Sequence, residues 1–370
     1  MRIALDATPL RERRTGVPQT VHELLTAMPA DVEVVPYVPS VRALLARTRR
    51  QPTGLPPTTR LLPIPARLLL WSWGRSDRPT ADRWLGDADV VHGTNFVVPP
   101  MRSRPTTVTV HDCWCARHPE HCQPERVAFT AVIQRAVDRG AWLHVSTQFS
   151  ATEVKDIYGA ERVEVVPFGV PPVDTGTAAP AVPAAVGEGP FVLALGAADA
   201  RKALDSLVRA FGALAADGGW GDLGLVLAGP GGPADEALEA AVDALPRPIA
   251  ARVIRLGWVS DAERRALLAR AAVLAYPSRY EGFGFPVLEA MAAGTPVVTT
   301  AAGAIPEVVG DAAEVVPVDD DTALAAGLSK VVDDGGRRAE LVAAGRRRAA
   351  GYTWAATATG MVELWRRLSA

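Results

Sequence analysis

Short apolar runs alternate with amphipathic segments along the first half of the chain. Helical patterns, for example at 125–139, lie between several runs that are rich in β-prone residues. Alternation of this kind predicts a parallel sheet whose strands are joined by right-handed crossover helices. The predicted strands of this half are 2–7, 32–38, 89–93, 106–112, 142–146 and 163–169.

The alternation begins again at residue 191, after a break. Residues 171–189 are rich in Pro, Ala and Gly and lack an apolar period, which predicts an interdomain linker. The sequence SDAE predicts a capping box at a helix start, because Ser260 and Glu263 can each accept a hydrogen bond from the other's backbone N–H group. The predicted strands of this half are 191–196, 223–229, 252–257, 273–278 and the runs PVVTT and EVVPV.

Together the two runs predict an α/β protein with two doubly wound, Rossmann-like parallel-sheet domains that face each other across a cleft. The N-terminal domain is predicted at 1–170 and the C-terminal domain at 190–352. The helical segment 353–370 is expected to pack back on the N-terminal domain. Ligands of such sheets bind beyond the carboxyl ends of the strands, where the motifs described below lie.

Composition and charge narrow the class of protein. Of 370 residues, 48% are hydrophobic and 22% charged, and the net charge of −2 gives no support for a nucleic-acid partner. No export signal is visible, and the apolar runs fall short of the ~20 residues of a spanning helix. Three cysteines, an odd number, predict reduced thiols. The expected location is the cytoplasm, and peripheral contact with the inner face of the membrane is a further expectation.

The segment EGFGFPVLE at 281–289 joins a predicted strand to a predicted helix. Gly282 and Gly284 belong to the connecting loop, where glycine lets the backbone approach a ligand, and a helix start offers N–H groups to anions. Glu281 and Glu289 then border one concavity, although either carboxylate alone could simply complement a helix dipole. Carboxylates beside N–H groups suit a ligand with many hydroxyls and a phosphate, such as a nucleotide sugar.

Two further glycine-containing loops follow predicted strands. In GAADARK, Arg201 and Lys202 stand at an expected helix start, where a diphosphate clamp is one interpretation and a solvated basic pair the other. In TGVPQT, Gly16 allows a phosphate or an acceptor to approach the backbone, but an ordinary turn explains it equally.

Metal-binding alternatives are disfavoured by spacing and position. HDCWCARHPEHC at 111–122 holds three His and three Cys, but it lacks the paired spacing of zinc sites, and a single His111 reaching the cleft is the preferred interpretation. DDDT at 319–322 precedes a helical pattern and is interpreted as helix capping.

The region 41–85 carries nine arginines against two aspartates, with three tryptophans nearby. Such a region could contact an anionic membrane surface or hold an anionic acceptor. Ordinary domain helices with extended arginine side chains are the alternative.

The sequence also resembles a known family. The stretch RLGWVSDAERRALLARAAVLAYPSRYEGFGFPVLEAMAAGTPVVTTAAGAIPEVVGDAA is similar to the C-terminal signature of family 4 retaining glycosyltransferases of the GT-B fold. The segments HGTNF and VTVHD look most like those of mannosyltransferase members of that family. DATPL with TGV, VVHGTNFVVPP, VTVHD, VSTQFS and VPFGV resemble the N-terminal landmarks of that family, and ARK resembles its basic pair.

The resemblance implies a role for each candidate residue. Glu281 would be the catalytic carboxylate that contacts the donor sugar, and His111 would approach the same sugar. Neither a divalent metal nor a cofactor is implied, because the basic pair neutralises the leaving diphosphate. The remaining implied contacts are Arg201 and Lys202 to the diphosphate, Phe283, Gly284 and Phe285 through backbone N–H groups, Glu289 to the ribose, and Trp258 and Val259 to the base.

Some positions depart from the family pattern. Pro18, Gln19 and Thr20 follow TGV where many members have a second glycine and a basic or aromatic pair, which puts contacts from that loop in doubt. Ala203 follows the basic pair where Asn or Gly is common.

The implied activity is transfer of a hexose from a nucleotide sugar to a glycan, lipid or small-molecule acceptor. GDP-mannose is the first choice of donor, and UDP-glucose or UDP-N-acetylglucosamine follows. A nucleotide-sugar epimerase sharing the GT-B architecture is the main alternative. A non-catalytic binding module and a pyridoxal-phosphate phosphorylase are weaker ones, because the paired glutamates and basic residues are intact and lysines are few.

Overall fold

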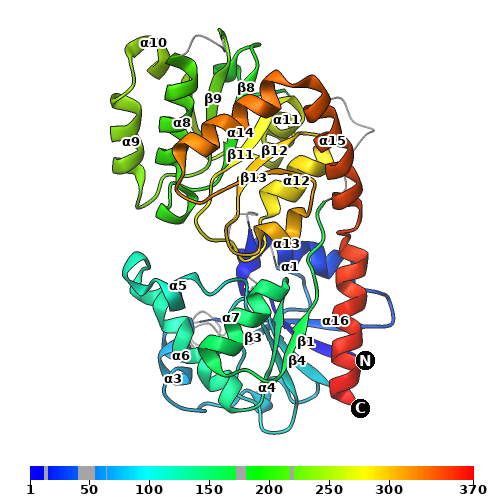
Figure 1. The fold of residues 1–370 in the computed structure, drawn as a ribbon. Helices are drawn as coiled ribbons and strands as arrows, with labels where there is room; N and C mark the ends of the chain where they lie inside the picture. Colours follow the sequence, from blue (N-terminus) through cyan, green and yellow to red (C-terminus); the bar gives the residue numbers. More distant parts are fainter. Residues whose placement is uncertain (12–15, 41–54, 64, 172–180, 217–220) are drawn as a thin grey trace. The chain divides into compact units, whose positions relative to one another are not determined.

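The computed structural model describes residues 1–11, 16–40, 55–63, 65–171, 181–216 and 221–370, and it divides into two compact units (Figure 1). One unit comprises Met1–Gly169 with Tyr352–Ala370, and the other comprises Val170–Gly351. Residues 172–180 of the predicted linker, and Arg42, Arg47, Arg49 and Arg50 of the basic region, lie outside the described residues.

The first unit is built on a seven-stranded parallel sheet in the order β3-β2-β1-β4-β5-β6-β7. Its strands are β1 (Arg2–Asp6), β2 (Glu33–Pro39), β3 (Arg60–Leu62), β4 (Val90–Gly93), β5 (Thr106–Thr109), β6 (Trp142–Val145) and β7 (Val163–Val165). Its α-helices are α1 (Val17–Thr26), α3 (Ala66–Trp73), α4 (Asp82–Leu85), α5 (Trp114–Arg117), α6 (Pro124–Asp138), α7 (Gln148–Tyr158) and α16 (Trp354–Ser369).

The C-terminal helix α16 completes the core of this first unit. It contacts β4 and α1, and Figure 1 shows it beside β1 and β4. Trp365 is fully buried, and its Nε1 donates a hydrogen bond to the Thr107 hydroxyl at 3.3 Å. An apolar side chain of this size excludes water from the sheet face that it covers.

A buried polar ladder crosses strands β4 to β6 of the same sheet. The His92 ring lies within hydrogen-bond distance of Thr107 and Thr109 hydroxyls, at 2.7 and 3.2 Å. The Thr109 hydroxyl is also 2.8 Å from His144 Nδ1, and His144 Nε2 donates to the Val166 carbonyl at 2.9 Å. Burial lowers the pKa of His144 to about 4, so the ring is neutral at pH 7 and its hydrogen bonds leave no buried charge.

The second unit has a six-stranded parallel sheet in the order β10-β9-β8-β11-β12-β13. Its strands are β8 (Phe191–Leu195), β9 (Gly224–Ala228), β10 (Val253–Gly257), β11 (Val273–Tyr276), β12 (Val297–Thr300) and β13 (Glu314–Val316). Its α-helices are α8 (Leu204–Ala216), α9 (Asp235–Asp243), α10 (Arg247–Ala250), α11 (Asp261–Arg270), α12 (Phe285–Ala293), α13 (Ile305–Val309), α14 (Asp321–Asp333) and α15 (Gly335–Ala350). The predicted fold class, two parallel α/β sheets, is confirmed.

Local capping predictions are also confirmed in this second unit. Ser260 and Glu263 form both hydrogen bonds of a capping box at the start of α11. Asp320 caps α14 by accepting a hydrogen bond from the Ala323 N–H at 2.8 Å. Pro286 lies in the first turn of α12, and Gly294 ends that helix in the left-handed conformation with φ of 81°.

The prediction of reduced cysteines is wrong for two of the three. Cys115 and Cys122 form a disulfide with Cα atoms 5.7 Å apart, while Cys113 is a buried free thiol. The short helix α5 is followed by a 3₁₀ turn, Pro119–His121, which folds the chain back so that the two cysteines meet. The cysteine count therefore gives no support for a reducing compartment.

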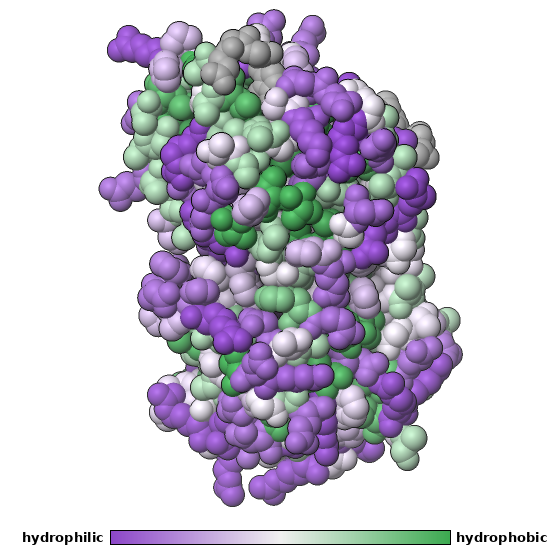
Figure 2. Space-filling model, viewed as in Figure 1, coloured by the Kyte–Doolittle hydropathy of each residue, from purple (hydrophilic) through white to green (hydrophobic). Residues whose placement is uncertain are grey.

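The exposed face seen in Figure 2 is mostly hydrophilic, with apolar side chains gathered in smaller patches. Among the described helices, none is both long and apolar enough to cross a lipid bilayer.

Candidate active site

Several predicted residues gather at the carboxyl edge of the second sheet, around β8 and β11. The strand order places β8, the first strand of this unit, between β9 and β11, and the winding of the chain reverses at this point. Parallel α/β sheets bind ligands in the crevice at such a switch point. Residues 196–202 follow β8 and residues 277–284 follow β11, so both loops lie at this edge.

Glu281 lies at the centre of this edge with both carboxylate oxygens paired to basic groups. It is 5% exposed. Oε1 accepts a hydrogen bond from Lys202 Nζ at 2.5 Å, and Oε2 accepts one from Arg201 Nη1 at 3.3 Å. Lys202 also donates to the hydroxyl of Tyr276 at 2.6 Å. The predicted basic pair and the predicted carboxylate are therefore brought together.

The charges of this cluster set its protonation. Burial alone would raise the pKa of Glu281, but Lys202 and Arg201 lower it below its usual value. Burial lowers the pKa of Lys202, and the attraction of Glu281 opposes that shift. The pKa of Tyr276 is raised, first by burial and then by the charge of Glu281. An ionised carboxylate thus lies beside a neutral phenol at pH 7.

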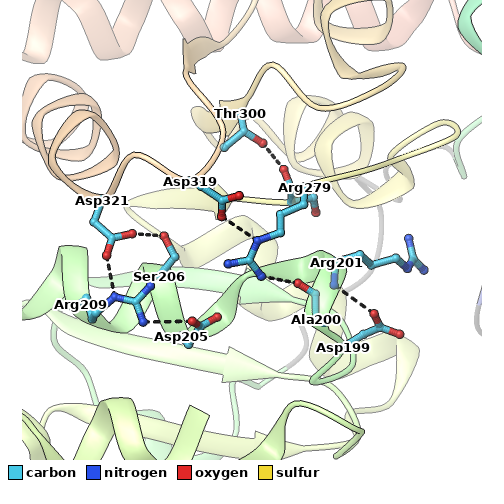
Figure 3. Close-up of polar contacts among 11 residues, drawn as sticks. Asp199, Ala200, Arg201, Asp205, Ser206, Arg209, Arg279, Thr300, Asp319 and Asp321 are labelled. Atoms are coloured by element: carbon cyan, nitrogen blue, oxygen red, sulfur yellow. Dashed lines mark hydrogen bonds and ion pairs between the residues drawn. The ribbon is translucent and has the colours of Figure 1, made fainter. Parts of the chain in front are cut away.

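The loop that carries the basic pair is shaped by its neighbours (Figure 3). Arg201 and Lys202 lie in a 3₁₀ turn, Ala200–Lys202, rather than at the start of α8, and Asp199 caps that turn through the Arg201 N–H at 3.1 Å. Ala203 ends the turn in the left-handed region with φ of 47°, a conformation that favours Gly or Asn over alanine.

Arg279 connects this loop to the segment before α14. Its Nη1 donates to the Ala200 carbonyl at 2.5 Å, and its Nε donates to Asp319 Oδ1 at 2.6 Å (Figure 3). Its backbone N–H donates to the Arg201 carbonyl at 2.7 Å. The backbone of the basic pair is thus held from two sides, which orders it before any ligand arrives.

Glu289 lies on α12 and is paired with a different cation. Arg264 of α11 forms an ion pair with Oε2 of Glu289, an oxygen that accepts no other hydrogen bond from a described residue. Burial raises the pKa of Glu289, Arg264 opposes the shift, and Asp261 adds to it. The two predicted glutamates therefore occupy separate electrostatic surroundings.

The turn between Glu281 and α12 depends on glycine. Gly284 has a φ of 93°, and a Cβ placed there would lie 2.6 Å from Ile305 Cδ1. The rings of Phe283 and Phe285, on either side, make an edge contact with centroids 4.9 Å apart. The Ala304 N–H donates to the Glu281 carbonyl at 2.9 Å, which ties the turn to the start of α13.

Trp258 and Val259 follow β10, at the same edge of the second sheet and just before α11. Trp258 is 47% exposed, one of few described large hydrophobic side chains with that much exposure. An exposed indole at a ligand-binding edge is suited to stacking on a flat ring.

His111 and Gly16 belong to the first unit. His111 Nε2 donates to the Thr94 carbonyl at 2.9 Å, so in the neutral ring Nδ1 is an acceptor. Its ring contacts Phe96 and Phe168 with centroids 5.6 and 5.7 Å apart, and burial lowers its pKa. Gly16 precedes α1 with φ of 55°, and a Cβ there would meet no atom of the described residues within 4 Å.

A buried carboxylate in the same unit was not among the predicted residues. Asp6, the last residue of β1, accepts hydrogen bonds at Oδ1 from the Thr8 N–H and hydroxyl, at 2.9 and 2.5 Å. Burial raises its pKa to about 6, although Thr8 opposes the shift. Tyr37, its partner in the register of β2, is buried, and its hydroxyl has no hydrogen-bond partner among the described residues.

Tyr276, Arg264 and Arg279 were also missed. Tyr276 lies within the predicted strand 273–278 and is the last residue of β11, and that position at a carboxyl edge is the signal that could have found it. Arg264 and Arg279 give no local signal, because their partners lie on other loops and helices.

The chain is similar in sequence to known glycosyltransferases. Residues 189–334 match the family described as glycosyl transferases group 1. D-inositol 3-phosphate glycosyltransferase of Kineococcus radiotolerans is 32% identical over 323 residues, covering 80% of this chain and 70% of that protein. O-antigen chain mannosyltransferase B of Escherichia coli is 29% identical over 292 residues, covering 75% of this chain and 74% of that protein.

The fold has solved counterparts as well. Sucrose-phosphate synthase from Thermosynechococcus elongatus aligns with a TM-score of 0.73 and 21% identity over 100% of this chain and 99% of that one. The chain belongs to the glycosyl transferases group 1 family and is a glycosyltransferase with the GT-B architecture. The comparisons do not support the epimerase alternative.

Proposed function

We propose that this glycosyltransferase is a family 4 enzyme that transfers a hexose, with retention of configuration, from a nucleotide sugar to a glycan, lipid or small-molecule acceptor. The observation that carries the proposal is the partly buried cluster of Glu281, Arg201 and Lys202 at the switch point of the second sheet. GDP-mannose is the first choice of donor, supported by the similarity to a protein named as a mannosyltransferase. UDP-glucose and UDP-N-acetylglucosamine are next.

In this proposal the basic pair binds the diphosphate of the donor. Arg201 supplies a planar set of donors and Lys202 a compact charge, and both lie next to the carboxylate of Glu281. The bond between the anomeric carbon and the phosphate oxygen breaks, and its electron pair leaves with the nucleoside diphosphate. Stabilising that developing charge is the main catalytic effect, so neither a divalent metal nor a cofactor is required.

Glu281 is proposed as the catalytic carboxylate that contacts the hydroxyls of the donor sugar. The acceptor hydroxyl attacks the anomeric carbon on the face from which the phosphate leaves, and its proton passes to the leaving phosphate. An ionised Glu281 would stabilise positive charge at the sugar ring during this step. His111 is proposed to approach the same sugar as a neutral ring.

The remaining predicted residues are assigned to binding. Glu289 would accept hydrogen bonds from the ribose, and Trp258 with Val259 would hold the base. The loop at 283–285 is proposed to meet the sugar and phosphate through backbone N–H groups of Phe283, Gly284 and Phe285. Gly16 is proposed to leave room for a phosphate or an acceptor beside α1, where no side chain of a described residue lies within 4 Å of an added Cβ.

The peripheral membrane contact predicted for the basic region belongs to this proposal too, at the inner face of the membrane. Helix α3 supports it, because Leu68 and Trp71 are 59% and 61% exposed and Arg67 and Arg75 lie on the same short helix or just after it. Apolar side chains flanked by arginine are typical of surfaces that contact anionic lipid.

A donor-binding experiment tests the nucleotide-sugar proposal. We expect one of GDP-mannose, UDP-glucose and UDP-N-acetylglucosamine to raise the melting temperature of the protein in EDTA, with GDP, UDP and NAD as comparison ligands. Glu289→Ala should bind that donor roughly 10- to 100-fold more weakly, because a charge-assisted hydrogen bond to the ribose is lost.

Glu236→Ala is the matched control, because Glu236 is an exposed glutamate on α9 of the same unit. It should bind the donor as the wild type does. No shift with any sugar nucleotide would contradict the proposed donor class. Equal affinity in wild type and Glu289→Ala would contradict only the ribose assignment.

A further inference from the structure

The first unit contains an arginine-lined cavity of about 580 Å³ to which the proposed function assigns no ligand, although Arg75 of its lining also belongs to the region of proposed membrane contact. It lies between the loop after α3, the segment before β5 and the C-terminal half of α6, and α3 packs against α6 (Figure 1). Its charged lining residues are Arg75, Asp77, Arg78, Arg102, Arg135 and Arg139.

This cavity lies away from the carboxyl edge of its own sheet. Arg102 comes shortly before β5, which begins at Thr106, and Arg139 comes shortly before β6, which begins at Trp142. Residues that precede parallel strands lie at the amino edge of the sheet, whereas His111 follows β5 at the opposite edge. The cavity is therefore separate from the first-unit residues assigned to catalysis.

Charge in the cavity is strongly unbalanced. Asp77 is the one acidic residue among the described residues that line the cavity. Its Oδ1 accepts hydrogen bonds from Arg135 Nη2 at 2.8 Å and from Arg139 Nη1 at 3.1 Å. Burial would raise the pKa of Asp77, but these two arginines lower it, so the carboxylate is ionised. One negative charge is left to neutralise five guanidinium groups.

Several guanidinium donors of the cavity have no hydrogen-bond partner in the part of the chain that the structure describes. Arg135 Nε and Arg139 Nη2 are buried without a hydrogen bond to any described residue. The guanidinium groups of Arg78 and Arg102, both exposed, form no ion pair or hydrogen bond within the described part of the chain. A buried donor without an acceptor costs free energy, and a ligand with acceptor oxygens removes that cost.

We propose that this cavity binds a phosphate group. Arg78 and Arg102 at the rim and Arg139 at the floor supply the planar, paired N–H donors that match phosphate oxygens. A bound phosphate dianion would also neutralise part of the positive charge of the arginines that Asp77 does not neutralise. A phosphate monoester in solution and the headgroup of an anionic lipid share this chemistry.

Calorimetric titration of the full chain with inorganic phosphate, at constant ionic strength set by NaCl, tests the site. We expect saturable binding that weakens at least about tenfold in Arg78→Ala/Arg102→Ala, because two charge-assisted contacts are lost while the ion pairs of Asp77 stay in place. Phosphate that binds instead at Arg201 and Lys202 would bind both proteins equally.

The matched control is Arg126→Ala/Arg347→Ala, which removes the same charge from exposed positions on α6 and α15. Co-sedimentation with phosphatidylcholine vesicles, with and without 20% phosphatidic acid, separates the two sources. Loss of lipid binding only in the cavity variant identifies a headgroup site, and loss of phosphate binding alone identifies a soluble phosphate. Wild type, cavity variant and control that behave alike in both assays would overturn the proposal.

Discussion

A Glu281→Gln variant is expected to transfer sugar at least about 100-fold more slowly than the wild type while binding the nucleoside diphosphate at least as tightly. The rate falls because glutamine has no charge to stabilise the sugar cation, and a single electrostatic contact of this kind is worth roughly that factor. The product binds as well or better because Arg201 and Lys202, which are paired to Glu281, become free to meet the diphosphate. The measurements are kcat with the donor that the binding assay selects and the dissociation constant of its nucleoside diphosphate.

Comparing kcat with the dissociation constant of the nucleoside diphosphate distinguishes a catalytic role of Glu281 from a role in positioning the basic pair. If Glu281 only held the basic pair in position, diphosphate affinity would fall together with kcat. Glu236→Gln, which neutralises an exposed glutamate of the same unit, should change neither quantity. A wild-type kcat in Glu281→Gln would remove Glu281 from the proposed mechanism.

Much of the fold follows from local sequence. The apolar runs that lie between helical patterns coincide with observed strands because buried parallel strands are almost continuously apolar. Strand β3 (Arg60–Leu62) was not predicted, because three residues between prolines are too few to show a hydrophobic period. The run at 163–169 was predicted too long, since pairing with β6 ends at Val165.

Part of the candidate site could also be predicted from local sequence, and part of it could not. The turn at Gly284 and the helix start at Pro286 could be predicted, because strand end, glycine and proline are adjacent in the chain. The pairing of Glu281 with Lys202 joins residues 79 positions apart, and its distance depends on how two loops of one sheet edge fold. Arg264 beside Glu289 is a product of helix packing between α11 and α12, which no short motif encodes.

The number of cysteines did not predict their redox state correctly. The odd number of cysteines predicted reduced thiols. In the structure the chain reversal after α5 pairs Cys115 with Cys122, and Cys113 is a buried thiol outside that disulfide. Proximity of two thiols is a property of the turn between them, and the 3₁₀ turn at Pro119–His121 was not predicted. Composition alone therefore misjudged the redox state.

The second large effect expected is a pH-dependent stabilisation by Asp6→Asn. The pKa of Asp6 is raised from 3.8 to about 6 in the folded protein, so the folded state binds more protons than the unfolded state between these values. Stability is therefore lost as the pH rises from about 4 to about 6, and it stays reduced above that range. Asparagine removes the buried charge, and it should raise the free energy of unfolding at pH 7.5 by about 3 kcal/mol, with little gain near pH 4.

Urea unfolding followed by tryptophan fluorescence measures this effect, because seven of the nine tryptophans lie in the unit that contains Asp6. Asp156→Asn is the matched control, because it replaces an exposed carboxylate on α7 of the same unit by the same amide. A constant difference between Asp6→Asn and wild type at every pH would mean that Asp6 titrates normally. In that case the Thr8 hydrogen bonds balance the effect of burial, and the charged carboxylate costs no folding free energy at the end of β1.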